Sequence, residues 1–211
     1  AYDINGGEAV ITNNLGSAVY NLADGVKITL QTGAEFNKAI TGTGTVTIQT
    51  NSNVFYNNTL TGPSTVNLIL GVSGSLTGGV NWSSKVLTAM PANAQVNVTT
   101  NQATAGYGVA ANSVQNSKLF LGDKVRLLYN YNPNEGGTTI ISIGELTGAA
   151  SASIEGGWVN SGTRGLNYYI GGLGTDATYN GVFKNYSSAP TAPLNIFKKG
   201  LGILTLISAN P

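Results

Sequence analysis

The sequence predicts an all-β fold, a right-handed parallel β-helix (a solenoid) of about ten coils. Three observations predict it: a repeat of about twenty residues, short alternating strands within the repeats, and almost no helical periodicity. A valine recurs at this interval at Val26, Val46, Val66 and Val86. When each strand pairs with the equivalent strand one coil later, about 4.8 Å away, such valines stack in one interior column. An antiparallel sandwich has no reason to keep that register.

The valines belong to longer matching strings. Residues 40–48 read ITGTGTVTI, and residues 60–68 read LTGPSTVNL. Each string ends in a strand whose alternate residues are apolar, preceded by a glycine turn. At about twenty residues per coil, the chain of 211 residues makes a stack roughly 50 Å long.

Short strands separated by glycine, asparagine and serine follow one another through the first half of the chain. Each has β-branched residues at alternating positions, as a half-buried strand does. The candidates are Ala9–Thr12, Val26–Gln31, Thr45–Thr50, Val66–Leu70, Lys85–Thr88 and Gln95–Thr99. Residues 101–117 break the pattern with small polar residues around Tyr107, and we expect a longer loop or irregular coil there.

Strand and glycine-turn chemistry continues after this break, at a less regular spacing. The candidates are Lys118–Tyr131, Thr138–Ile143, Ser151–Ile154, Leu166–Ile170, Thr178–Phe183, Leu194–Phe197 and Ile203–Ile207. We therefore expect one domain over residues 1–211, with a seam or projecting loop near 101–118 as its one interruption.

Composition excludes several classes of function. Only 9% of the residues are charged, against about 25% in an average domain, and the net charge is +1 without a basic run. Binding of nucleic acid through phosphate neutralisation is therefore not expected. No apolar stretch approaches the ~18 residues of a membrane span. The absence of cysteine excludes disulfides and fits bacterial export. Residues 1–4 lack a basic and then apolar leader, so we expect that any signal peptide has been removed or lies outside this sequence.

Three segments in the C-terminal third share a pattern with a known family. They read IGELTG at 143–148, GGLGTDATYNGV at 171–182 and KGLGILTLISAN at 199–210. Together they resemble the autotransporter-associated β-strand repeat over roughly residues 143–210. The chain departs from that family's pattern at Ile203, where threonine is usual, at Ser208, where glycine is common, and at Pro211. The resemblance implies a right-handed β-helix in an exported bacterial protein, often a passenger region or an accessory part of a polysaccharide-degrading enzyme.

Catalytic chemistry has few candidates. Histidine is absent, which excludes a histidine base or metal ligand. Glu135 and Glu155 are twenty residues apart, with Glu145 between them, and stacked carboxylates of this kind could hydrolyse a glycosidic bond. Solvated turn carboxylates are the alternative. Asp123, Lys124 and Arg126 lie close together and Arg164 is the only other arginine, but no aspartate cluster supplies Ca²⁺ ligands. We predict no catalytic residue, metal or cofactor.

Aromatic residues suggest a binding surface. Tyr129 and Tyr131 share one face of a predicted strand, while Tyr168 and Tyr169 point to opposite faces. Exposed rings beside amides and hydroxyls suit a sugar, whose C–H face stacks while its hydroxyls form hydrogen bonds. We predict that Trp158, Tyr129, Tyr131 and, after these, Tyr168 bind carbohydrate. Stacking of these rings inside the helix is the alternative.

We therefore expect a non-catalytic bacterial β-helix module, secreted or displayed at the cell surface. It would bind polysaccharide or act as a spacer for a carbohydrate-active protein, with neighbouring modules of a longer chain as partners. The alternatives are a pectate-lyase-like polysaccharide lyase or glycoside hydrolase, and an adhesin or autotransporter stalk. Both termini look like coil interiors, so we expect further chain or a partner to cover them.

Overall fold

The computed structural model describes residues 1–12, 19–31, 39–50, 60–71, 90–102, 105–109, 113–129, 139–156, 166–185 and 194–207. These residues form an all-β structure of long parallel sheets stacked in register, consistent with a parallel β-solenoid. None of the described residues forms a helix of the length and apolarity that crossing a membrane requires.

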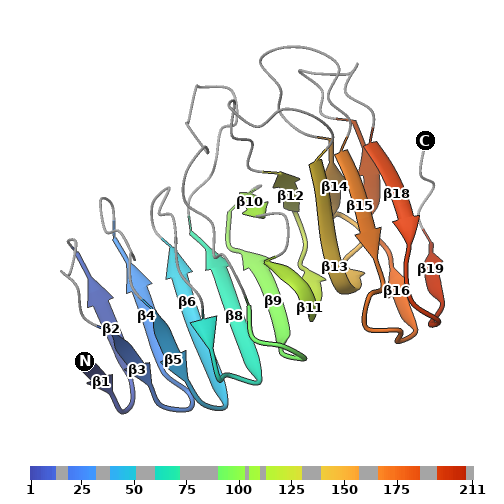
Figure 1. Cartoon of the computed structure of the whole chain (residues 1–211). Coiled ribbons are helices and arrows are strands. Elements are labelled where there is room, and N and C mark those ends of the chain that lie inside the picture. The colour runs from blue at the N-terminus through green and yellow to red at the C-terminus, as the bar shows by residue number, and fades with distance from the viewer. Residues whose placement is uncertain are drawn as a thin grey trace.

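An 11-stranded sheet, the main sheet, runs the length of this structure. Its path joins β2 (Glu8–Ile11), β4 (Lys27–Leu30), β6 (Thr45–Thr50), β8 (Thr65–Leu70), β9 (Gln95–Thr100), β11 (Val114–Leu121), β13 (Thr139–Gly148), β15 (Leu166–Ile170) and β18 (Leu194–Lys198). Figure 1 shows these strands side by side in chain order, from blue to red. Beside this path, β16 (Ala177–Tyr179) pairs with β13 and with β19 (Leu204–Leu206).

Two 4-stranded sheets lie beside the main sheet. One joins β1 (Tyr2–Ile4), β3 (Tyr20–Leu22), β5 (Ile40–Gly42) and β7 (Leu60–Thr61). The other joins β10 (Ala105–Val109), β12 (Val125–Tyr129), β14 (Ser153–Glu155) and β17 (Val182–Lys184). Every strand pairing among the described residues is parallel, so equivalent residues of successive strands lie next to each other.

The core consists of apolar columns between the sheets. Val46 pairs with Val66, and Val66 with Val96, and all three side chains are fully buried. A second column contains Ile28, Ile48, Leu68 and Val98. Alternate residues of the same strands face outward, as the period of two requires. The predicted stacking of aliphatic side chains is thus confirmed for these strands.

The predicted place of Val86 in the column is wrong, because Val96 pairs with Val66 there. Parallel pairing fixes which residues lie opposite each other but leaves the length of the connection free, and added loop length costs little. The step from β8 to β9 is therefore 30 residues, whereas the step from β6 to β8 is 20. Val86 and the predicted strand Lys85–Thr88 lie outside the described residues.

The expectation of a loop over 101–117 is also wrong in part. Residues 105–109 form β10, which pairs in register with β12. This strand contains two glycines and few large apolar side chains, so the alternation that reveals other strands is missing. Its backbone ladder with β12 holds it in place instead.

Candidate functional site

The outer face of β13, β15 and β18 carries aromatic and amide side chains in adjacent rows. One row joins Asn167 on β15 to Asn195 on β18, and the next joins Tyr169 to Phe197. We call these four residues the aromatic–amide patch. The alternate residues of β15, which are Leu166, Tyr168 and Ile170, are buried. The alternation of β-strand side chains therefore presents the patch outward.

Contacts within the patch set its geometry. The rings of Tyr169 and Phe197 lie 4.9 Å apart between centroids, tilted by 48°. The side-chain amide of Asn195 donates a hydrogen bond of 2.9 Å to the side-chain carbonyl oxygen of Asn167. Phe197 keeps 42% of its surface exposed, and Ile140 in the neighbouring row keeps 44%. The exposed part of the Phe197 ring, beside amides that can donate and accept hydrogen bonds, is thus available to a ligand from solvent.

Lys199 borders the patch. Its ammonium lies 4.5 Å from the centroid of the Tyr169 ring, within the range of a cation–π contact. Lys198 is the ladder partner of the buried Ile170, so its side chain is on the opposite face of β18 from Phe197. The Lys198 ammonium donates hydrogen bonds to the backbone carbonyl oxygens of Lys199 and Gly200. Both lysine side chains are exposed.

The predicted carbohydrate-binding residues are not the four residues of the aromatic–amide patch. Tyr168 is fully buried, and its hydroxyl donates to the backbone oxygen of Glu155 at 3.3 Å. Its ring has no face open to solvent, so the expectation that a sugar stacks on Tyr168 is wrong. Tyr129 ends β12 with its side chain outside the described part of the structure, and Tyr131 and Trp158 also lie outside it. Their predicted role stays a prediction.

The patch residues were missed by sequence reasoning, although a signal exists. Tyr169 and Phe197 are 28 residues apart, as are Asn167 and Asn195, and the register aligns both pairs. A search for aromatic and asparagine pairs at one shared spacing in the C-terminal third would have found them. This spacing of 28 residues is longer than the twenty-residue period of the N-terminal coils, so that period does not reveal it.

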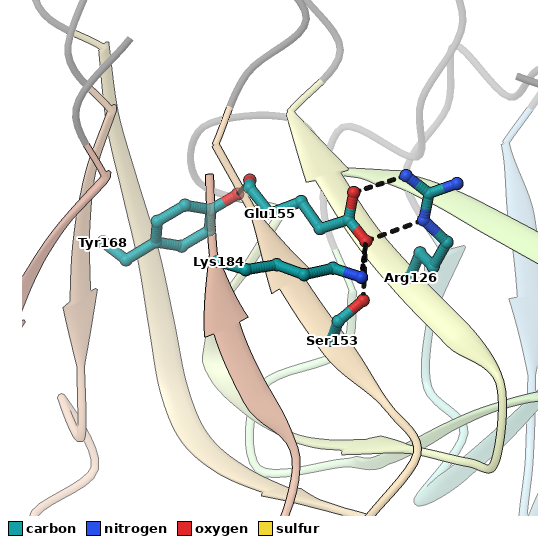
Figure 2. A network of polar contacts seen from close by, with 5 residues as sticks. All are labelled: Arg126, Ser153, Glu155, Tyr168 and Lys184. Atoms are coloured by element: carbon teal, nitrogen blue, oxygen red, sulfur yellow. Dashed lines mark hydrogen bonds and ion pairs between the residues drawn. The ribbon is translucent and has the colours of Figure 1, made fainter. Parts of the chain in front are cut away.

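A buried ion cluster lies on the sheet of β12, β14 and β17 (Figure 2). The carboxylate of Glu155, only 1% exposed, lies between the guanidinium of Arg126 and the ammonium of Lys184. Arg126 Nε donates to Glu155 Oε1 at 2.7 Å, and Ser153 Oγ donates to the same oxygen at 2.8 Å. The Lys184 ammonium is 3.1 Å from that oxygen. The adjacent strands bring these groups together because Glu155 pairs with Lys184 in the ladder.

Burial would raise the pKa of Glu155, but the hydrogen bonds from Arg126 and Ser153, with the charges of Arg126 and Lys184, outweigh it and lower the pKa. A carboxyl group held ionised in this way is unsuited to be a general acid, which needs a raised pKa. Its predicted partner Glu135 lies outside the described residues. Glu145 accepts a hydrogen bond from the Thr175 hydroxyl, and Asp123 accepts one from Ser151. The cluster has the chemistry of a structural ion network.

Tyr179 is a second buried polar group near this cluster. Its ring lies 5.1 Å from that of Phe183, and its hydroxyl has no hydrogen-bond partner among the described residues. Burial, with the nearby charge of Glu155, raises the pKa of Tyr179 well above its usual range. Glycines make room for the ring, because a Cβ on Gly148 would come within 2.7 Å of Tyr179 Cε2. The ring is thus well packed while its hydroxyl lacks a partner.

Replacing Tyr179 by phenylalanine is expected to raise the free energy of unfolding by about 1 kcal/mol, because it removes a buried hydroxyl without a partner. Tyr168→Phe is the matched control, since the Tyr168 hydroxyl does donate a hydrogen bond. That variant should lose about 0.5–1.5 kcal/mol. Denaturant unfolding of both variants and the parent measures these free energies of unfolding. A larger loss of stability in Tyr179→Phe than in Tyr168→Phe would contradict the prediction.

A groove of about 450 Å³ lies between the turns 60–64 and 90–94. Pro63, Met90 and Pro91 are among its lining residues, none of which is charged or aromatic. Among the residues that the structure describes, no group of three or more His, Asp or Glu side chains could hold a metal ion. The groove therefore lacks the ring faces that the aromatic–amide patch has.

Comparison with known proteins yields no relative: no protein-family model, no curated protein and no solved structure matches this chain. The resemblance of residues 143–210 to the autotransporter-associated β-strand repeat therefore stays a prediction.

Proposed function

We propose that this protein is a non-catalytic module that binds polysaccharide through the aromatic–amide patch on the outer face of its main sheet. In this proposal the sheets belong to one right-handed β-helix of roughly ten coils. The protein would be exported by a bacterium and would act as an accessory or spacer to a carbohydrate-active protein. These finer points derive from the sequence pattern and from the family resemblance.

The single observation that carries the proposal is the pairing of Tyr169 and Phe197 in one row beside Asn167 and Asn195 in the next. A sugar ring is apolar on its faces and polar around its edge. A ligand above this row would place a face on the rings while the asparagine amides bond its hydroxyls. A rigid sheet holds both rows, so little side-chain ordering opposes binding.

A lyase or hydrolase is a weaker candidate. The one strongly buried carboxylate described, Glu155, is bound by two cations and a hydroxyl. Incubation of the protein with a panel of polyuronates and neutral glycans, with and without Ca²⁺, tests for catalysis. Release of unsaturated or reducing ends by the protein would overturn the non-catalytic part of the proposal.

Affinity electrophoresis on a panel of polysaccharides tests the binding. Tyr169→Ala and Phe197→Ala are each expected to weaken binding about tenfold, which corresponds to about 1.4 kcal/mol for a ring at the centre of a contact. Tyr2→Ala is the matched control, since Tyr2 is 52% exposed on β1, at the other end of the stack. Trp158→Ala and Tyr131→Ala test the residues predicted from the sequence. Unchanged binding in Tyr169→Ala and Phe197→Ala, or no binding of any polymer by the parent, would contradict the proposal.

A further inference from the structure

The ammonium of Lys199, at the border of the aromatic–amide patch, has no carboxylate partner among the described residues. The ion pairs of that described part of the chain join Lys27 to Glu8, and Arg126 and Lys184 to Glu155. Lys199 lies instead over the Tyr169 ring. Among the described residues, this places a positive charge without a paired carboxylate next to the exposed ring of Phe197.

The cation–π contact between Lys199 and the Tyr169 ring is weak enough for a ligand to replace it. A cation–π contact at an exposed site contributes about 0.5–1 kcal/mol. The Lys199 side chain is flexible and exposed, so its ammonium can turn from the ring toward an incoming anion.

We infer that the patch selects an acidic polysaccharide, one whose sugar rings carry carboxylates, with Lys199 as the group that binds the carboxylate. This inference rests on the proposed function. A uronate carboxylate is attached directly to a ring carbon and lies at the edge of the ring. With the ring face on the exposed part of Phe197, that edge can meet the Lys199 ammonium, which lies over the neighbouring Tyr169 ring.

Polygalacturonate and its fully methyl-esterified form make a matched pair of probes, since the sugar is the same and only the charge differs. Affinity electrophoresis or calorimetry at low salt should give binding at least fivefold tighter for polygalacturonate. The preference for polygalacturonate over its methyl ester should become smaller as the ionic strength rises toward 0.15 M. At that ionic strength exposed charges are screened over about 8 Å. Dextran sulfate and dextran test for a sulfate preference.

Lys199→Gln is expected to weaken polygalacturonate binding about two- to fivefold, as an exposed charge contact allows. This variant should not change binding of the methyl ester. Lys27→Gln is the control, since it removes the same charge from the outer face of the same sheet, on β4.

The outcomes separate this inference from the proposed function. Equal binding of acid and ester, with both lost in Tyr169→Ala, would overturn the acidic preference and keep the polysaccharide-binding function. Binding of dextran sulfate but not polygalacturonate would overturn the carboxylate assignment. An equal loss in Lys27→Gln and Lys199→Gln would show an effect of net charge only and would also overturn it. Binding of no polymer at all would remove the proposed function itself.

Discussion

Replacing Glu155 by glutamine is expected to lower the free energy of unfolding by about 2–4 kcal/mol. The change keeps the size of the side chain but removes the negative charge that lies between Arg126 and Lys184. Breaking a buried ion pair by removing one partner usually costs about 3–5 kcal/mol, because the other charge is left buried. The expected loss is smaller here because water can solvate the two cations, whose side chains are 22% exposed for Arg126 and 48% exposed for Lys184.

Lys184→Gln is the matched control for this prediction. It removes the more exposed partner and leaves the Arg126–Glu155 pair in place, so it should cost no more than about 1 kcal/mol. Denaturant unfolding of the three proteins at pH 7 measures both effects. A loss in Glu155→Gln no larger than in Lys184→Gln would contradict the structural role of the cluster.

The effect of Glu155→Gln should depend on pH. Because the pKa of Glu155 is lowered in the folded protein, its contribution is fully present above the unfolded pKa of about 4.3 and is lost as the pH falls through the folded value. The stabilities of the parent and the variant should therefore converge in acid. The variant keeps some acid sensitivity, since hydrogen bonds from Thr29 and Lys27 also lower the pKa of Glu8. A constant difference between pH 7 and pH 2 would contradict the assignment.

Replacing Leu68 by alanine is expected to lower the free energy of unfolding by about 2–4 kcal/mol. Leu68 is 3% exposed and pairs with Ile48 on one side and Val98 on the other. Removing it takes apolar surface from the core and leaves a cavity in a column that neighbouring side chains cannot fill. Ile69→Ala is the matched control, because Ile69 is also aliphatic and comes next on β8 but faces outward.

Ile69 is partly exposed, so Ile69→Ala should lose about 1 kcal/mol or less. Thermal or urea unfolding of both variants gives the comparison. Equal losses would mean that the two faces of β8 are buried alike, which contradicts an inward column and an outward row.

Much of the fold followed from side-chain alternation in the sequence. Val46 and Val66 are predicted and found as neighbours, since the connection between their strands is short. The step to Val96 was not predictable, because a parallel ladder tolerates an insertion in the connection without a change in the strand. The three-residue strands β1, β3 and β5 were missed, since three residues are too few for alternation to show.

The candidate site was less predictable than the fold. Tyr168 and Tyr169 had to face opposite sides, but adjacency alone does not say which side is interior. Only the ladder with β18 places Tyr169 beside Phe197 on the outer face. The pairing of Glu155 with Arg126 and Lys184 carried a signal, because each cation lies 29 residues from the carboxylate. That spacing differs from the twenty-residue period of the N-terminal coils.

Disulfide formation between paired cysteines tests the parallel register most directly, since the natural chain has no cysteine to interfere. Asn67 and Asn97 lie opposite each other on the outer face, and Asn97 donates a hydrogen bond of 2.9 Å to Asn67. The variant Asn67→Cys/Asn97→Cys should therefore cross-link readily in the folded protein, because paired strands about 4.8 Å apart fall within the Cα separation of a disulfide. The variant Asn67→Cys/Leu87→Cys, which a strict twenty-residue register would join, should cross-link far more slowly. The reverse result would contradict the stacking of strands on which the fold and the candidate site depend.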